Sequence, residues 1–357
     1  MLNAYPTIVC RLGKTSLAAT LLLCGFALKT QNLPVAAAPS SIRSFTEWCA
    51  AKTDFAPDTQ RTIDALLQQA DTEDCQQAND ILLGMTELNL SAKELVDLSP
   101  IESLSLTQMT RLDISNNQIS DLSAIADFTH LTHLYASNNQ IADLSPLNAP
   151  NLIKLNLDNN QVSNLQPLQS LTSLTTLFLN NNQVIDLSPL RDLEKMTVLF
   201  ANNNQIRDVR PLHAMVEMKT LSLSQNAIAD IDPLSSMTQI YELHLDFNQI
   251  ENIDAVRSMT QLNELYLNDN QVRDIRPLAS LVNLTELFIR NNQIADISPL
   301  PEMPKLNWAD LENNQITDIS PLAPMTTLVR AILTHNPVAE NGDRPVCPLE
   351  PASICQF

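Results

Sequence analysis

Residues 287–300 read LFIRNNQIADISPL, and this phrase decides the fold because it recurs almost end to end along the chain. Written as L-x-L-x-x-N-x-I-x-D-[LI]-x-P-L, it places one asparagine in each copy: Asn117, Asn139, Asn160, Asn182, Asn204, Asn226, Asn248, Asn270, Asn292, Asn314 and Asn336. The spacings are 22, 21 and then 22 eight times, and a degenerate copy with Lys93 in the asparagine position precedes them. A fixed period of this length predicts a solenoid, in which each repeat buries its apolar face against its neighbours.

Each residue type in the phrase has a physical role. Leu287 and Ile289 alternate inward from a short strand, and strands of successive repeats should pair into one parallel sheet. The asparagine follows where the chain turns into the interior, and its amide can satisfy turn groups of its own repeat and of the adjacent one. The eleven asparagines are therefore expected to form a structural ladder. Ser298-Pro299 predicts the start of one turn of 3₁₀ or α-helix, with the serine as N-cap and the proline at the first helical position.

The repeat resembles the leucine-rich repeat family, in particular the 22-residue class of bacterial internalins and of the eukaryotic protein-phosphatase regulatory subunit. The resemblance covers residues 85–338, about 12 repeats. It implies an α/β solenoid with a curved parallel β-sheet on the concave face and short 3₁₀ or helical turns on the convex face. It also implies a helical N-terminal cap at residues 38–84. The ending CPLEPASICQF, within a C-terminal cap at residues 339–357, resembles the tail of secreted bacterial, notably cyanobacterial, members.

The predicted N-terminal cap contains three short helices. The first opens at residues 45–49 (FTEWC), and the second follows Pro57. The third is expected to start at Asp71 or Thr72 and to carry Cys75, Ala78, Ile81 and Leu82 on one face. Such a cap would cover the raw apolar end of the first repeat.

The first 37 residues predict a secretory signal peptide. Two cations precede the apolar run of residues 17–28 (LAATLLLCGFAL), and residues 35–37 (Val-Ala-Ala) offer small side chains for cleavage after position 37. The apolar run is shorter than the roughly 20 residues that span a bilayer, which disfavours the alternative of an uncleaved anchor. A lipoprotein modified at Cys24 is a further alternative, although Leu23 stands where that motif needs a small residue.

Four cysteines remain after removal of the signal peptide, and four cysteines allow three pairings. Eleven strand steps of about 4.8 Å separate the two ends of the repeats by roughly 50 Å, whereas the Cα atoms of a disulfide lie within about 7 Å. This leaves Cys49–Cys75 in the N-terminal cap and Cys347–Cys355 in the C-terminal cap, with free buried thiols as the alternative. Paired cysteines behind a signal peptide predict a secreted, periplasmic or cell-surface protein.

Composition and register argue against several function classes. The formal charge is −19, which repels nucleic acid and anionic lipid, and four glycines leave no glycine-rich phosphate loop. No catalytic arrangement and no metal-ligand spacing follow from the register, so the sequence predicts no enzyme, no cofactor and no metal. An aspartate follows most asparagine turns and could suggest calcium, but acceptance of turn N–H groups is the simpler interpretation for Asp121, Asp143, Asp186, Asp208, Asp230, Asp274, Asp296 and Asp318.

The concave face is more informative because the repeat does not fix its residues. Strand positions between the inward leucines should form columns with a step of about 4.8 Å. Six aromatic residues are predicted to point at solvent there, a poor place for phenylalanine unless something covers it: Tyr135, Phe178, Phe200, Tyr266, Phe288 and Trp308. Other candidate binding residues near them are Glu242, Glu264 and Glu286 in one row, with His244, Asp246 and Arg290.

The sequence therefore predicts a secreted, monomeric binding module that holds a protein ligand in its concave face, and the glutamate row favours a basic ligand. One alternative is that the rings only pack on each other across strands. Another is a glycan-binding or cell-wall-binding module with Tyr266, Phe288 and Trp308 as stacking platforms. A phosphatase-regulator-like scaffold fits the repeat but not the signal peptide or the cap cysteines. The glutamate row could also match the roughly 5 Å carboxylate separation of a retaining glycosidase, but an open sheet has no walls to shift a pKa.

Overall fold

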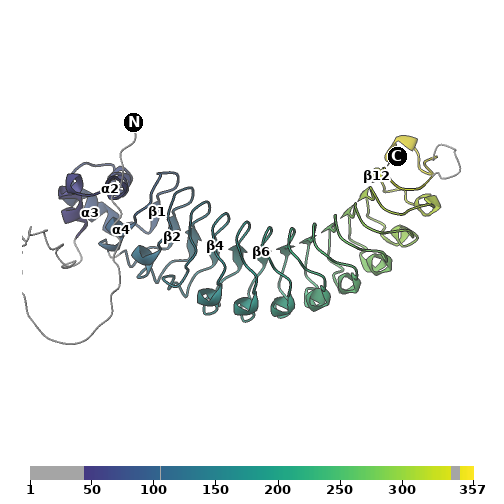
Figure 1. The fold of residues 1–357 in the computed structure, drawn as a ribbon, viewed down its shortest axis with the longest axis horizontal. Coiled ribbons are helices and arrows are strands. Elements are labelled where there is room, and N and C mark those ends of the chain that lie inside the picture. The colour runs from purple at the N-terminus through teal and green to yellow at the C-terminus, as the bar shows by residue number, and fades with distance from the viewer. Residues whose placement is uncertain (1–43, 105, 339–345) are drawn as a thin grey trace, which may run out of the picture. The chain divides into compact units, whose positions relative to one another are not determined.

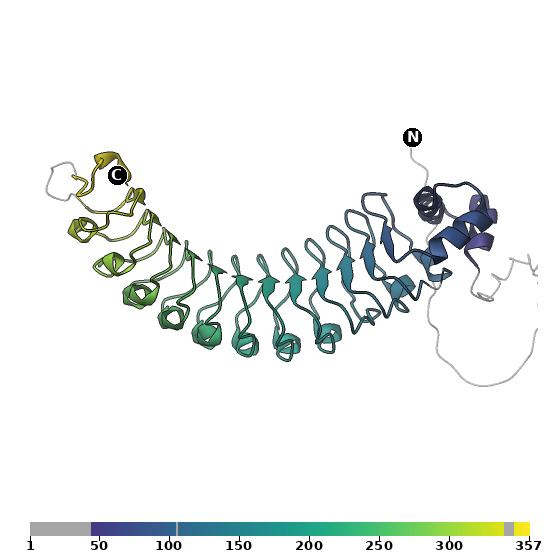
Figure 2. The same cartoon turned by 180° about the vertical axis from the view of Figure 1, so that it is seen from behind.

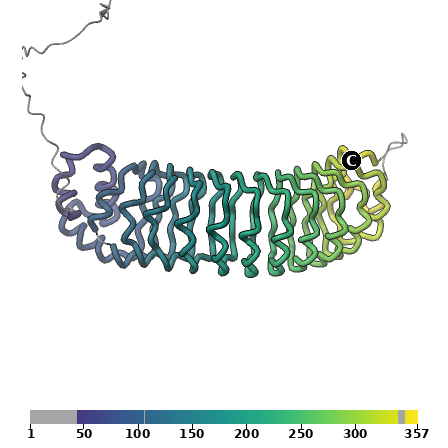
Figure 3. The backbone as a smooth tube through the Cα atoms, turned by 60° about the horizontal axis from the view of Figure 1, so that its bottom comes forward, coloured from purple at the N-terminus to yellow at the C-terminus, as the bar shows by residue number. Residues whose placement is uncertain are grey.

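The computed structural model describes residues 44–104, 106–338 and 346–357, so the predicted signal peptide lies outside the described residues. It confirms the predicted α/β solenoid, since 13 short strands pair in sequence order into one open, curved, parallel sheet. The strands line the inner side of the curve and the short turns line the outer side (Figures 1 and 2). Successive repeats lie side by side as parallel rungs (Figure 3).

Each strand from β1 to β12 has three residues, and the second inward residue of the phrase, such as Ile289, follows the strand directly. The middle residue of each three-residue strand is buried, whereas its neighbours face the concave side. The strands are β1 (Glu87–Asn89), β2 (Arg111–Asp113), β3 (His133–Tyr135), β4 (Lys154–Asn156), β5 (Thr176–Phe178), β6 (Val198–Phe200), β7 (Thr220–Ser222), β8 (Glu242–His244), β9 (Glu264–Tyr266), β10 (Glu286–Phe288), β11 (Trp308–Asp310), β12 (Arg330–Ile332) and β13 (Cys355–Gln356).

The convex side carries single helical turns. The first is α-helical and most of the others are 3₁₀: α4 (Ser99–Glu102), η2 (Ser123–Ile125), η3 (Gln166–Leu168), η4 (Ser188–Leu190), η5 (Arg210–Leu212), η6 (Asp232–Ser236), η7 (Asp254–Ser258), η8 (Arg276–Ser280), η9 (Leu300–Glu302) and η10 (Ser320–Leu322). The predicted serine N-cap is wrong. In η9 the turn begins at Leu300, and its N-cap residue is Pro299 rather than Ser298. In η4 the turn begins at Ser188 itself, and the N-cap residue Leu187 makes no side-chain cap bond.

The serine is instead held by the aspartate two residues before it. Asp186 Oδ1 accepts the N–H of Ser188 at 2.8 Å, and Asp186 Oδ2 accepts its hydroxyl at 2.7 Å. The same backbone bond to residue i+2 occurs at all eight aspartates of the phrase, which confirms their predicted role as turn acceptors. In the part of the chain that the structure describes, no group of His, Cys, Asp and Glu is arranged to hold a metal ion.

The asparagine ladder links each repeat to the one before it. Asn182 Nδ2 donates to the carbonyl of Leu157 in the preceding repeat at 2.8 Å, and to the carbonyls of Leu179 and Asn180 at 3.2 Å. Its Oδ1 accepts the N–H of Val162 at 2.9 Å. The other ten asparagines make the same kinds of bonds. One amide thus satisfies turn groups of two repeats at once.

From residue 44 onward, three helices and one 3₁₀ turn precede the first strand: α1 (Phe45–Ala50), η1 (Lys52–Asp54), α2 (Pro57–Ala70) and α3 (Cys75–Leu83). The expected start of α3 is wrong, because Asp71 adopts a left-handed φ of 51° that ends α2, and Asp74 caps α3 instead. Ile81 is exposed, so it does not share the buried face of Leu82. The Cys49–Cys75 disulfide joins α1 to α3.

The C-terminal segment adds a strand that the sequence did not predict. Cys355 of β13 pairs with Ala331 of β12, after the 3₁₀ turn η11 (Ala352–Ile354). The Cys347–Cys355 disulfide closes this segment, with Cα atoms 5.6 Å apart. Both disulfides join the cysteines that the sequence paired. Among the described residues, no helix has the length and apolar character needed to cross a membrane.

Candidate binding face

The strand register places the concave residues in the predicted columns. Glu242, Glu264 and Glu286 are directly aligned on β8, β9 and β10, and we call them the acidic row. His244, Tyr266 and Phe288 are aligned in the next column of the same strands, and Trp308 of β11 is aligned with Glu286. We call His244, Tyr266, Phe288 and Trp308 the aromatic stack. The C-terminal half of the sheet therefore presents carboxylates and rings in adjacent columns.

The rings of the aromatic stack pack against one another. Tyr266 lies 4.2 Å from His244 and 4.6 Å from Phe288 between ring centroids, with planes within 10° of parallel. Trp308 is tilted by 51° against Phe288, at 5.6 Å. All four side chains are nevertheless only partly buried. Cross-strand packing and exposure to a ligand are thus compatible, because the packed rings still present their outer edges.

The acidic row has no ion-pair partner among the described residues. The Tyr266 hydroxyl donates to Glu264 Oε2 at 3.0 Å. Burial and then the neighbouring Glu264 charge raise the pKa of Glu286. Burial and the bond to Glu264 also raise the pKa of the Tyr266 hydroxyl, so Tyr266 stays a neutral donor. The protein itself therefore leaves three aligned carboxylates without a cation.

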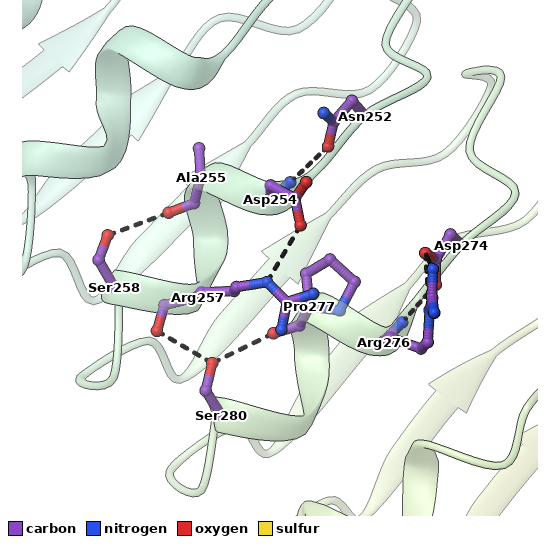
Figure 4. Close-up of polar contacts among 9 residues, drawn as sticks. All are labelled: Asn252, Asp254, Ala255, Arg257, Ser258, Asp274, Arg276, Pro277 and Ser280. Atoms are coloured by element: carbon purple, nitrogen blue, oxygen red, sulfur yellow. Dashed lines mark hydrogen bonds and ion pairs between the residues drawn. The ribbon is translucent and has the colours of Figure 1, made fainter.

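On the convex side, some carboxylates form ion pairs with arginines. In Figure 4, Arg257 Nε contacts Asp254 Oδ1 at 3.0 Å within η7, and Arg276 Nη2 contacts Asp274 Oδ2 at 2.5 Å beside η8. Serine hydroxyls tie neighbouring turns together there, as Ser280 Oγ donates to the carbonyl of Arg257. Some convex carboxylates, such as Asp254 and Asp274, thus contact an arginine of their own turn. The three aligned glutamates of the acidic row have no such contact among the described residues.

In the N-terminal half of the face, the protein's own cations cover the rings. The guanidinium of Arg111 lies 4.6 Å from the Tyr135 ring centroid, and Lys154 Nζ lies 5.5 Å from Tyr135 and 5.3 Å from Phe178. Phe178 stacks on Phe200 at 5.3 Å. The predicted aromatics therefore form two groups, and the C-terminal group also has a cationic partner, since the guanidinium of Arg330 lies 4.9 Å from the Trp308 ring centroid.

Asp246 and Arg290 belong to a third column of the concave face, and both side chains are partly buried. Asp246 Oδ1 accepts the N–H of Asn268 at 2.8 Å, and burial raises the pKa of Asp246 to about 6. Arg290 lies two strands further on, and its Nε is buried without a hydrogen-bond partner among the described residues. Burial also lowers the pKa of His244, so this ring is neutral at pH 7.

Sequence reasoning missed two aromatic residues beside β8. Tyr241 precedes the strand and is 53% exposed, and Phe247 follows Asp246 and is 47% exposed. Phe247 also has a left-handed φ of 53°. Its signal was present in the sequence, because other copies of the phrase mostly carry Asn or Asp just before the ladder asparagine.

Comparison with known proteins agrees with this geometry. The leucine-rich repeat model in two copies matches residues 129–170, 172–213, 216–258 and 260–302, and a second leucine-rich repeat model matches residues 84–141. An internalin, inlF from Listeria monocytogenes, is 33% identical with a TM-score of 0.75, over 79% of this chain and 85% of that one. The chain belongs to the leucine-rich repeat family. No curated protein sequence matches it.

Other solved structures share the fold. The functional domain of InlJ from Listeria monocytogenes is 24% identical with a TM-score of 0.70, over 86% of this chain and 64% of that one. The leucine-rich repeat ectodomain of the plant receptor kinase GASSHO1/SCHENGEN3 from Arabidopsis thaliana is 20% identical with a TM-score of 0.62, over 79% of this chain and 37% of that one. The latter was solved in complex with Casparian strip integrity factor 2. Leucine-rich repeat proteins of these kinds serve as protein-binding modules, and neither matching family model describes an enzyme.

Proposed function

We propose that the protein is a secreted or surface-exposed monomer that binds a basic protein ligand through the C-terminal half of its concave face. The observation that carries this proposal is the acidic row, unpaired and directly beside the aromatic stack. In this proposal residues 1–37 are a cleaved signal peptide, and residues 38–84 and 339–357 cap a 22-residue-class repeat array.

The three aligned glutamates should destabilise the free protein, and a basic ligand would compensate their charge. Like charges aligned across strands destabilise a sheet, and each aligned pair costs a few tenths of a kcal/mol or more, up to roughly 1 kcal/mol. Three convex carboxylates of the same chain, Asp208, Asp254 and Asp274, contact arginines instead. A basic ligand would provide the missing cations, steer association and favour one binding orientation. The aromatic stack would supply the anchoring contacts, because aromatic residues dominate binding hot spots.

The packing of the stack favours a protein over a glycan. Sugars dock on the open faces of aromatic rings, but both faces of Tyr266 are covered, by His244 and by Phe288. Ring edges and a neighbouring carboxylate suit the mixed apolar and cationic surface of a protein. The two disulfides and the extracellular-type neighbours support the proposed location.

The test uses residues 38–357 as bait for a phage library of random twelve-residue peptides, beside a glycan array. We expect the enriched peptides to be rich in Lys and Arg, and we expect no binding to the glycan array. Tyr266→Ala with Phe288→Ala and Trp308→Ala should abolish peptide binding and leave the thermal midpoint nearly unchanged. The matched triple variant Arg111→Ala, His133→Ala and Lys154→Ala should matter little. If the second triple variant loses binding and the first does not, the ligand binds the N-terminal half of the concave face and the proposed site is wrong.

A further inference from the structure

Phe247 occupies a backbone conformation suited to asparagine. Its φ is 53°, and the equivalent residue of every other repeat from Asn116 to His335 also has a positive φ. Most of those residues are Asn or Asp, which enter the left-handed region at low cost, whereas a bulky aromatic residue there is an outlier. The repeat imposes this conformation on Phe247, so the ring is held at the expense of local strain.

Phe247 also lies in a gap of a second ladder of side chains. Asn181 Nδ2 donates to Asn159 Oδ1 at 2.7 Å, and Asn203 Nδ2 donates to Asn181 Oδ1 at 2.7 Å. Asn291 likewise donates to Asp269 Oδ1 at 2.8 Å. Between Asn203 and Asp269 the corresponding residues are Gln225 and Phe247, and Phe247 has no polar side-chain atom that could continue the series. Asp269 Oδ2 in the following repeat is buried without a hydrogen-bond partner among the described residues. Phe247 therefore combines a strained backbone conformation with a side chain that cannot join this series.

The same repeat exposes aromatic rings at both edges of its strand. Tyr241 and Phe247 are about half exposed and lie six residues apart along an extended chain, roughly 20 Å. Between them the strand presents Glu242 of the acidic row, His244 of the aromatic stack and Asp246. We call the two edges of the concave face its rims. The repeat of β8 thus has an aromatic residue on each rim and carboxylates between them.

We infer that Phe247 and Tyr241 are rim anchors, and that the basic ligand crosses the concave face at β8 from one rim to the other. This inference rests on the proposed function and adds the path of the ligand. Strained residues persist where the strain serves a function, and exposed aromatics are typical binding anchors. Glu242 and Asp246 lie between the two rings, so the crossing segment is a basic one. The aromatic stack and the acidic row run along the curve from β8 to β11, so a ligand that contacted only them would not reach both rims of one repeat.

The probe is the set of selected twelve-residue peptides whose binding is lost in the triple variant Tyr266→Ala, Phe288→Ala and Trp308→Ala. An extended peptide of this length reaches roughly 40 Å, enough to cross the face. Phe247→Asn removes the ring and restores the residue that the ladder favours. We expect at least a tenfold loss of affinity together with a rise of about 1–3 °C in the thermal midpoint. Tyr241→Ala should also cost tenfold in affinity.

The opposite signs of the two effects separate an anchor from a structural residue. The matched control is Ile185→Asn, which removes a 58% exposed apolar side chain from another repeat and should leave affinity unchanged. Affinity within twofold of wild type for both Phe247→Asn and Tyr241→Ala would overturn the inference, while the proposed function would stand on the triple variant. A lowered midpoint for Phe247→Asn, or an equal loss for Ile185→Asn, would also overturn it. If no selected peptide responds to the triple variant, the proposed function itself fails.

Discussion

Tyr266 and Phe288 stack face to face across β9 and β10, with ring centroids 4.6 Å apart and planes 8° from parallel. Their strands also carry Glu264 and Glu286 in register, so two stacked rings adjoin two unpaired carboxylates. Such a pairing of apolar and acidic columns is what a surface for Lys-rich or Arg-rich segments requires. Charge, burial and packing on this face can each be tested with a separate variant.

The asparagine ladder should contribute measurably to stability. Asn226 Nδ2 donates to three carbonyls, of Ala201, Leu223 and Ser224, and its Oδ1 accepts the N–H of Ile206. Asn226→Ala should reduce the free energy of unfolding by about 1–3 kcal/mol, because these groups lose their partner. Denaturant titration measures the change, with exposed Gln225→Ala as the control. Equal midpoints for Asn226→Ala and wild type would contradict the ladder.

The acidic row should cost stability in the absence of a ligand. Glu264→Gln removes the central charge but keeps an acceptor for the Tyr266 hydroxyl, so we expect a gain of about 0.2–1 kcal/mol that shrinks at high salt. The same variant should slow association with basic peptides. Convex Glu251, which faces Arg273 at 3.6 Å, provides the control. A gain from Glu251→Gln as large as that from Glu264→Gln would show that net charge, not the row, is responsible.

The buried carboxyl of Asp246 should make stability depend on pH. Its folded-state pKa of about 6 exceeds the value near 4 of an unfolded aspartate. Between these values the folded protein holds a proton that the unfolded chain has released, so this contribution is present at low pH and is lost as pH rises through 6. Asp246→Asn is neutral throughout, and its thermal midpoint should exceed that of wild type by more at pH 7.5 than at pH 4.5.

Asp186 provides a control of opposite sign. Hydrogen bonds from the Ser188 hydroxyl and N–H lower the pKa of Asp186, so its contribution is present at neutral pH and is lost as pH falls through that lowered value. Asp186→Asn should therefore lower the midpoint at pH 7.5 and matter less in strong acid. If Asp246→Asn shows the same trend with pH as Asp186→Asn, the burial of Asp246 has no thermodynamic consequence.

Export and disulfide formation can be read from one mass spectrum. The mature protein should lack about 37 residues and four protons, because of signal cleavage and the bonds Cys49–Cys75 and Cys347–Cys355. Peptide mapping checks the pairing. A retained N-terminus would exclude secretion by cleavage, and a diacylglyceryl adduct on Cys24 would establish the lipoprotein alternative.

The period of the phrase made most of the fold predictable. Once asparagines recur every 22 residues, the strand register follows, and with it the alignment of Glu264 with Glu286 and of Tyr266 with Phe288. The disulfide pairs followed from distance alone, since the two caps lie at opposite ends of the repeats.

The features that could not be predicted from the sequence depend on contacts with neighbouring side chains rather than on the repeated phrase. The pKa of Asp246 reflects burial by surrounding side chains, and the stacking of Tyr266 reflects side-chain torsions that no spacing encodes. The short strand β13 escaped notice because residues 355–356 lack the phrase and pair only through their backbone.

The serial pairing of the sheet has a mechanical consequence. Each strand from β1 to β13 bonds only to the strands before and after it in the chain. A pulling force on the two ends therefore passes through every rung in turn, and the array must yield one rung at a time, from an end inward. The covalent closures Cys49–Cys75 and Cys347–Cys355 lie at the two places where such unravelling would begin.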